Sequence, residues 1–469
     1  MVTVDETWQP ARLFPITGIG GADEQERRGC SAFLAVLKSV REFGRALTMR
    51  CGAPAGTIET FIEVPFALGD AKFRPDGLIR ATRGQTSWTA LIEVTTGRND
   101  LKSDQIANYL DIAREQGFNA VITISHEVAT TPGVHPVTVD KRKLKKVDLF
   151  HLSWSRIHTE ALIEQTNQMV SDADQAWILS EFVRYIENSK SGAWDFDDMG
   201  PEWVEVRNAA AQQTLRANDK ETLSVVARFD QLLAFSGMEL SRRLGANVQQ
   251  RLSRKERADH ASRIQDQAVL LAKTGQLTGS LIVPNAVTPI DIVVDLRANR
   301  VDCTAVLPAP SEGRPATRIN WLIRQLKESP GDLLITATSA RAKDSGPCHP
   351  LSVLRDAPML LLETPQAEIK SFTLTLNHAA GTKRGQGRGS FVSSVTSLVD
   401  RFYTEVILNL KTWSAPPPRP KQAPQSDAQE IEPPDTSKDH DFEPSPEPSL
   451  QPAIAMATSD GTREPQERT

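Results

Sequence analysis

The feature that most constrains the fold of this chain is the order of helical and extended segments in its first third. Apolar residues recur at helical spacing over residues 22–48, which predicts one long amphipathic helix. Next come extended segments separated by short glycine-containing turns, and they predict an antiparallel meander over residues 60–66, 73–81 and 88–95. A second helix over 101–115 and a buried strand over 120–125 follow, and a right-handed crossover makes this last strand parallel to the third. The predicted order is α-β-β-β-α-β.

The remainder of the chain divides into a helical stretch and a second mixed region. After the basic run KRKLKK and a further strand at 149–154, helical periodicity dominates residues 157–275. Beyond Gly275 we expect helices at 317–327 and 391–410, and strands at 280–283, 290–295, 301–306, 332–338, 359–362 and 371–376. We therefore predict a multidomain α/β protein with a core domain at 22–155, a helical connector at 156–275, a second α/β domain at 276–413 and a tail at 414–469.

The tail differs from the rest of the chain in composition. It holds 12 of the 30 prolines and, with 11 acidic and 5 basic residues, a charge of −6. Because the whole chain carries −5, the body is close to neutral. The tail also has few aromatic and β-branched residues, so it cannot bury enough apolar surface to offset the entropy of ordering. We therefore expect a disordered acidic tail. A solubilising spacer and a partner-binding segment both remain open for it.

Apolar runs and cysteines indicate the compartment. The longest apolar runs are far shorter than the roughly 18 residues that a membrane-spanning helix needs, and the first ten residues form no signal-peptide core. The four cysteines form no C-x-x-C pair, so neither a zinc knuckle nor a disulfide framework is indicated. We expect a cytoplasmic protein without a membrane partner.

Two carboxylates in the first region are the strongest chemical signal. Glu93 lies in the middle of the apolar strand ALIEVT, where an unpaired acid is costly. Asp76 lies in the neighbouring extended segment, between Pro75 and Gly77. Carboxylates on adjacent strands can converge on one cation, and two such groups with waters and substrate phosphates commonly hold Mg²⁺. A turn residue of an Asp-Gly pair is the alternative for Asp76.

The following helix presents polar groups that suit such a site. Lys102, Gln105 and Tyr109 fall on one stripe beside the apolar stripe of the helix. A cation, an amide and a phenol on one side can hold phosphate oxygens or a polarised water.

These residues in this order resemble the PD-(D/E)xK (restriction-endonuclease-like) nuclease superfamily, in particular its members with a Q-x-x-x-Y motif. The resemblance covers residues 22–155 and implies an α-β-β-β-α-β core. It implies Asp76 and Glu93 as ligands of Mg²⁺ or Mn²⁺, Gln105 and Tyr109 as site-shaping or DNA-contacting residues, and Glu26 of the first helix as an optional metal-site acid. DNA is then the expected partner, and bacterial DNA processing, stress response or defence the expected setting.

One position departs from the family pattern. The family places a lysine two residues after the glutamate, where it activates the attacking water, and this chain has Thr95 there. Threonine supplies no positive charge for a hydroxide or a phosphorane. Either Lys102 replaces the missing lysine in catalysis, or the domain is a degenerate nuclease fold that binds nucleic acid or serves as a scaffold, with a protein partner on the second domain or the tail.

Other charged segments are weaker signals. The histidines at 126, 135, 151 and 158 show no zinc-ligand spacing, so we expect ordinary surface or core histidines. The acidic run DFDD at 195–198 is typical of a solvated loop, with cation binding as the alternative. Three basic runs, KRKLKK, RLSRKER and KRGQGRG, are candidate phosphate contacts.

Overall fold

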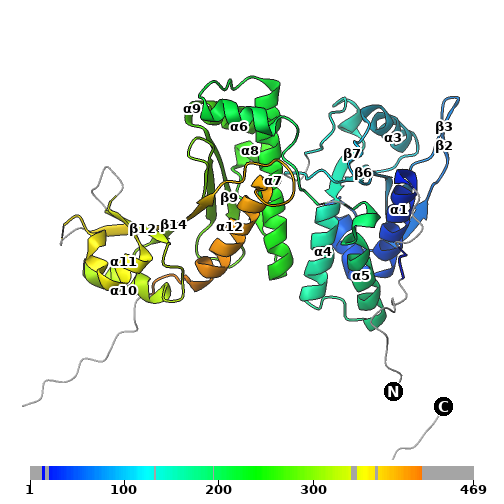
Figure 1. Cartoon of the computed structure of the whole chain (residues 1–469). Coiled ribbons are helices and arrows are strands. Elements are labelled where there is room, and N and C mark those ends of the chain that lie inside the picture. Colours follow the sequence, from blue (N-terminus) through cyan, green and yellow to red (C-terminus); the bar gives the residue numbers. More distant parts are fainter. Residues whose placement is uncertain are drawn as a thin grey trace, which may run out of the picture. The chain divides into compact units, whose positions relative to one another are not determined.

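The computed structural model describes residues 13–15, 21–130, 134–193, 195–339, 346–364 and 368–414. All of these belong to one compact unit, Met1–Ala415 (Figure 1). The tail predicted at 414–469 lies outside the described residues except for its first residue. Within the described part, the protein is a mixed α/β structure with two larger sheets and a small hairpin.

The first sheet contains five strands in the order β1-β4-β5-β6-β7. The antiparallel part consists of β1 (Thr57–Ile62), β4 (Gly77–Arg83) and β5 (Thr86–Val94), which confirms the predicted meander. β6 (Ala120–Ser125) is parallel to β5, as predicted, and β7 (Asp148–Ser153) is parallel to β6 and forms the sheet edge. An additional hairpin of β2 (Phe66–Leu68) and β3 (Ala71–Phe73) was not predicted.

Helices cover both faces of this sheet. α3 (Ser103–Glu115) buries Ile106 and Leu110 against Leu91 and Val121 on one face. On the other face α1 (Ala22–Ser39), α2 (Arg41–Arg50), α4 (Trp154–Thr166) and α5 (Ala173–Ile186) share one apolar core. The sheet is thus the middle layer of three.

The single helix predicted over residues 22–48 is wrong, because the chain breaks it at Val40. Val40 has extended backbone angles, φ −101° and ψ 98°, and α2 begins directly after it. A Cβ at Gly44 would lie 2.1 Å from the carbonyl oxygen of Leu37. The glycine therefore allows α2 to fold closely against the end of α1.

The second sheet is antiparallel throughout, in the order β13-β12-β14-β11-β10-β9-β8. Its strands are β8 (Gln249–Gln250), β9 (Gln276–Ile282), β10 (Ile290–Asp295), β11 (Arg300–Pro308), β12 (Leu334–Ser339), β13 (Cys348–Pro350) and β14 (Ile369–Ala379). It shares a core with α6 (Trp203–Ala211), α7 (Lys220–Leu244), α9 (His260–Thr274), α10 (Pro315–Gln325), α11 (Leu351–Asp356) and α12 (Phe391–Glu405). α8 is a short helix at Arg254–Ala258.

Two predictions in this part are wrong in detail. Residues 359–362, expected as a strand, form the 3₁₀ helix η3 (Pro358–Leu361). Proline fixes φ at a helical value and has no N–H for a strand ladder, which favours the helical turn. The helix expected at 391–410 ends at Glu405 and is followed by the 3₁₀ helix η4 (Ile407–Asn409). Two further 3₁₀ helices are η1 (Lys143–Lys145) and η2 (Ser189–Ser191).

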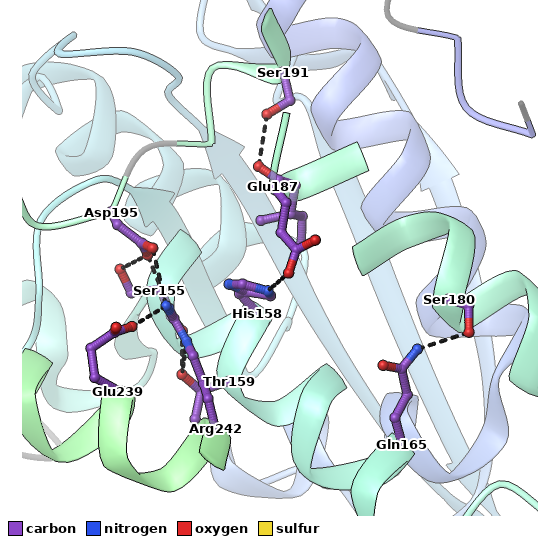
Figure 2. A network of polar contacts seen from close by, with 11 residues as sticks. Ser155, His158, Thr159, Gln165, Ser180, Glu187, Ser191, Asp195, Glu239 and Arg242 are labelled. Carbon is purple, nitrogen blue, oxygen red and sulfur yellow. Dashed lines mark hydrogen bonds and ion pairs between the residues drawn. The ribbon is translucent and has the colours of Figure 1, made fainter. Parts of the chain in front are cut away.

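The helices predicted as a connector contribute to both cores, α4 and α5 to the first and α6, α7 and α9 to the second. Figure 2 shows the polar contact by which α4 and α7 meet. Arg242 of α7 donates to the carbonyl of Ser155 at 3.1 Å and to the Thr159 hydroxyl at 3.0 Å, and it pairs with Asp195 at 2.9 Å. One arginine thus ties the first sheet's helices to the second core. The predicted domain boundaries at 155/156 and 275/276 stay predictions.

None of the described helices is long and apolar enough to cross a membrane.

Candidate metal centre

Of the two predicted carboxylates, Glu93 lies on β5 and Asp76 lies directly before β4. Gly77 pairs with Ile92 in the β4–β5 ladder, so the residue before β4, Asp76, lies opposite Glu93. The Asp76 backbone carbonyl accepts from the N–H of Glu63 at 3.1 Å. Its side-chain Oδ2 accepts from the N–H of Val94 at 2.8 Å. Backbone groups therefore hold Asp76 in place at the end of β5.

The Asp-Gly turn considered for Asp76 is not what the chain forms. Gly77 is the first residue of β4 and pairs with Ile92. A Cβ at this glycine would lie 2.5 Å from Cδ1 of Leu34. The glycine is therefore needed for the close packing of α1 on the strand. Asp76 is not required as a turn residue.

Glu93 is buried, with only 7% of its surface exposed, and α3 contacts it. Its Oε1 accepts a 2.5 Å hydrogen bond from Nε2 of Gln105, and the same amide donates to the Tyr109 hydroxyl at 3.0 Å. Residues four apart on a helix share a face, so the Q-x-x-x-Y spacing brings both side chains to the glutamate. The other oxygen, Oε2, is buried without a hydrogen-bond partner among the described residues.

Burial controls the ionisation of this pair. Burial raises the pKa of Glu93 well above its usual range, and the charge of Asp76 raises it further. Burial also raises the pKa of Asp76, although the Val94 N–H bond opposes the shift. The charge of Glu26 raises both pKa values. Burial and then the Glu93 charge raise the pKa of Tyr109, so its phenol stays protonated.

Glu26 is near the pair but has partners of its own. Its Oε1 accepts from the backbone N–H of Thr96 at 3.3 Å and from Nδ2 of Asn99 at 3.0 Å, so it braces the loop after β5. Among the described residues, no three His, Cys, Asp or Glu side chains converge as a metal-binding group. Mg²⁺ is commonly held by one or two carboxylates with waters and phosphates, so the Asp76–Glu93 pair fits such an ion without Glu26 as a third ligand.

Thr95, at the position of the family lysine, and Lys102, its candidate replacement, differ in burial. Thr95 is 9% exposed; its N–H donates to the Ile124 carbonyl at 2.8 Å, and its hydroxyl approaches the same oxygen at 3.5 Å. Lys102 is the exposed residue at the N-terminus of α3. Within the described part of the chain, no ion pair joins a lysine or arginine to Asp76, Glu93 or Glu26.

A polar row continues from Glu93 across the sheet, and sequence reasoning missed it. Glu93 pairs with Thr123 of β6, and Thr123 pairs with His151 of β7, so the three side chains share one face. The Thr123 hydroxyl lies 2.8 Å from Nδ1 of His151 and 2.8 Å from Nε2 of His135. The available signal was a threonine in an apolar strand followed by two histidines. Burial is the largest cause that lowers the pKa of His151, to about 3, so its imidazole is neutral.

The acidic run at 195–198 is not a free cation site, because arginines already pair with its carboxylates. Asp195 pairs with Arg242 at 2.9 Å, and Asp197 pairs with Arg98 at 3.3 Å. Asp198 lies 3.6 Å from Arg384 of the KRGQGRG run. In the KRKLKK run, Lys143 forms an ion pair with Asp111 of α3. Part of the basic charge noted in the sequence therefore serves the fold.

In comparisons with known proteins, no family model and no curated protein matches the chain.

Proposed function

We propose that the chain is a divalent-metal-dependent, restriction-endonuclease-like protein that acts on DNA, with Asp76 and Glu93 as the ligands of Mg²⁺ or Mn²⁺. One observation carries the proposal: the buried Oε2 of Glu93 has no hydrogen-bond partner among the described residues and lies beside a second carboxylate. Burial and the neighbouring carboxylate oppose full ionisation of this pair, and a divalent cation would relieve that cost.

The surrounding residues orient the two ligands. The N–H of Val94 fixes Asp76 through Oδ2, and Gln105 fixes Glu93 through Oε1. The second oxygen of Glu93 is left for the metal. Hydrogen-bond donors to metal-ligating side chains set the orientation of the ligands and the affinity for the metal. A bound divalent cation would supply charge stabilisation at a phosphodiester and a water of lowered pKa.

The order of elements around the pair supports the nuclease-like assignment. The pair lies where the antiparallel β4–β5 hairpin meets the parallel β5–α3–β6 unit, with α1 on the other face. The resembled superfamily implies a core of this kind for residues 22–155, and we take the order of elements as support for the proposal.

A second candidate function rests on Thr95. Its hydroxyl lies against the Ile124 carbonyl and carries no charge, and Lys102 has no described contact with the carboxylates. A protein that binds a cation and nucleic acid without cleaving the strand would have this arrangement. Both candidate functions use the same metal centre, and they differ in whether the protein cleaves the nucleic acid.

The test is a cleavage assay with linear double-stranded, single-stranded and branched DNA in Mg²⁺ or Mn²⁺. We expect metal-dependent cleavage that Asp76→Ala abolishes. Asp70→Ala is the matched control, because Asp70 is an exposed residue at the β2–β3 turn. If wild type binds the metal and DNA but does not cut, the second candidate holds. Cleavage that survives Asp76→Ala would place the chemistry elsewhere.

A further inference from the structure

A cavity of about 440 Å³ lies beside β7, the edge strand of the first sheet. Its walls come from the end of α2, the second half of β7, the middle of α7 and the segment around β8. Cavities of this size are typical of small-molecule sites. Neither Asp76, directly before β4, nor Glu93 of β5 lines the cavity, although His151 at the far end of the polar row does.

The charges that line the cavity have one sign. Three arginines, Arg50, Arg156 and Arg257, line it, and its described lining contains no aspartate or glutamate. Arg50 pairs with Glu160 at 2.9 Å. Arg257 belongs to the basic run RLSRKER and is exposed. The cavity therefore attracts anions.

Arg156 is the decisive residue, because its charge lacks a carboxylate partner among the described residues. Its Nη1 donates to Oδ1 of Asn247 at 3.3 Å, and no described ion pair includes it. Burial, and then the charge of Arg50, lowers the pKa of Arg156 to about 10, and the charge of Glu160 opposes the shift. A guanidinium is always charged in practice, and the one acid that acts on Arg156, Glu160, already pairs with Arg50. A desolvated guanidinium without an ion pair of its own favours an incoming anion.

The start of α4 adds to this attraction. Ser153 lines the cavity and caps the helix by accepting from the N–H of Arg156 at 3.0 Å. The N-terminus of a 13-residue helix carries a partial positive charge and N–H groups that suit phosphate. Arg156 extends from the first turn of this helix.

The rest of the lining suits an apolar body. Met238 of α7 lines the cavity, as do Val248 and Leu252, which flank β8. All three are buried. Asn247 and Gln249 add amide groups for hydrogen bonds.

We propose that this cavity binds a small phosphomonoester of mononucleotide size, with its phosphate on Arg156, Arg50 and the start of α4 and its apolar part against Met238 and Val248. Neither of the proposed metal ligands lines this cavity.

The test is calorimetric titration of the full chain with adenosine 5′-monophosphate, adenosine and inorganic phosphate, in EDTA so that no metal contributes. We expect saturable binding of the monophosphate and competition by inorganic phosphate. Adenosine should bind with an affinity at least about tenfold lower than that of the monophosphate. Arg156→Gln should lower the affinity for the monophosphate about tenfold or more, since it removes a charge-assisted hydrogen bond. Arg254→Gln is the matched control, because Arg254 is in the same basic run but does not line the cavity.

Arg257→Gln is the second test variant, for use if the Arg156 variant does not fold. Because Arg257 is exposed, its substitution should leave the fold intact, and it should also weaken binding of the monophosphate. Absence of saturable binding up to about 10 mM ligand would overturn the proposal. So would a monophosphate affinity that Arg156→Gln and Arg257→Gln both leave unchanged. Binding of an oligonucleotide without binding of the monophosphate would overturn the small-ligand assignment. Because EDTA removes the metal, none of these outcomes bears on cleavage.

Discussion

Two buried acids in this protein have opposite environments. Asp230 of α7 is 1% exposed, and Arg263 of α9 donates to both of its oxygens at 2.9 Å. Hydrogen bonds from His260 and Arg263 outweigh burial and lower the pKa of Asp230. Glu93 is buried to a similar extent, yet it has an amide, a phenol and another acid as neighbours, and its pKa is raised. Among the described residues, Asp230 has a cationic partner and Glu93 has none, although Glu93 has a second carboxylate beside it. The pair at Glu93, unlike Asp230, is therefore open to an added cation.

The largest effect should come from breaking the satisfied pair. Arg263→Met leaves the Asp230 carboxylate buried without its main partner, and we expect a loss of about 3–5 kcal/mol of unfolding free energy. Chemical denaturation measures it. The double variant Arg263→Met with Asp230→Asn should recover most of the loss, because no buried charge is left. A loss below about 1 kcal/mol for the single variant would remove the contrast with Glu93.

The two sites should respond to pH with opposite signs. The raised pKa values of Asp76 and Glu93 mean that the native state keeps a proton that the unfolded chain has lost, so stability from this pair falls as pH rises above the unfolded values near 4. The lowered pKa of Asp230 gives stability that is present at neutral pH and lost as pH falls.

We therefore expect Glu93→Gln to gain stability relative to wild type between pH 5 and 8, by ~1.4 kcal/mol per pH unit over which the native pair holds the extra proton. Denaturation curves at several pH values measure the difference. A pH-independent difference would show that Glu93 ionises normally in the folded chain.

The smallest effect should come from the phenol behind the glutamate. Tyr109→Phe removes the hydroxyl that accepts from Gln105 at 3.0 Å, and we expect a loss of about 0.5–1.5 kcal/mol of unfolding free energy with weaker metal binding. Tyr403→Phe is a control on α12 in the second core. Equal metal affinity for wild type and Tyr109→Phe would limit the tyrosine to a packing role.

Local patterns predicted the parts of the site that are close in sequence. The acid within an apolar strand identified Glu93, and helical spacing placed Gln105 and Tyr109 on one stripe of α3. The break at Val40 and the β2–β3 hairpin depend on close tertiary contacts such as Gly44 against Leu37, which no local pattern contains. The cavity was beyond prediction for the same reason, since Arg50, Arg156 and Arg257 come from three separate elements. Lys102 was chosen from its stripe alone, and its exposed position at the start of α3 depends on where that helix begins.

The most direct test of the central claim is calorimetric titration of Mn²⁺ into the full chain at pH 8, where Asp76 and Glu93 must release their proton to bind. We predict one saturable site in wild type and in Asp70→Ala, with affinity lowered about tenfold or more in Asp76→Ala and Glu93→Gln. Proton release on binding should appear as a dependence of the measured heat on the buffer. Equal Mn²⁺ affinity in all four proteins, or no binding in any of them, would contradict a metal centre at Asp76 and Glu93.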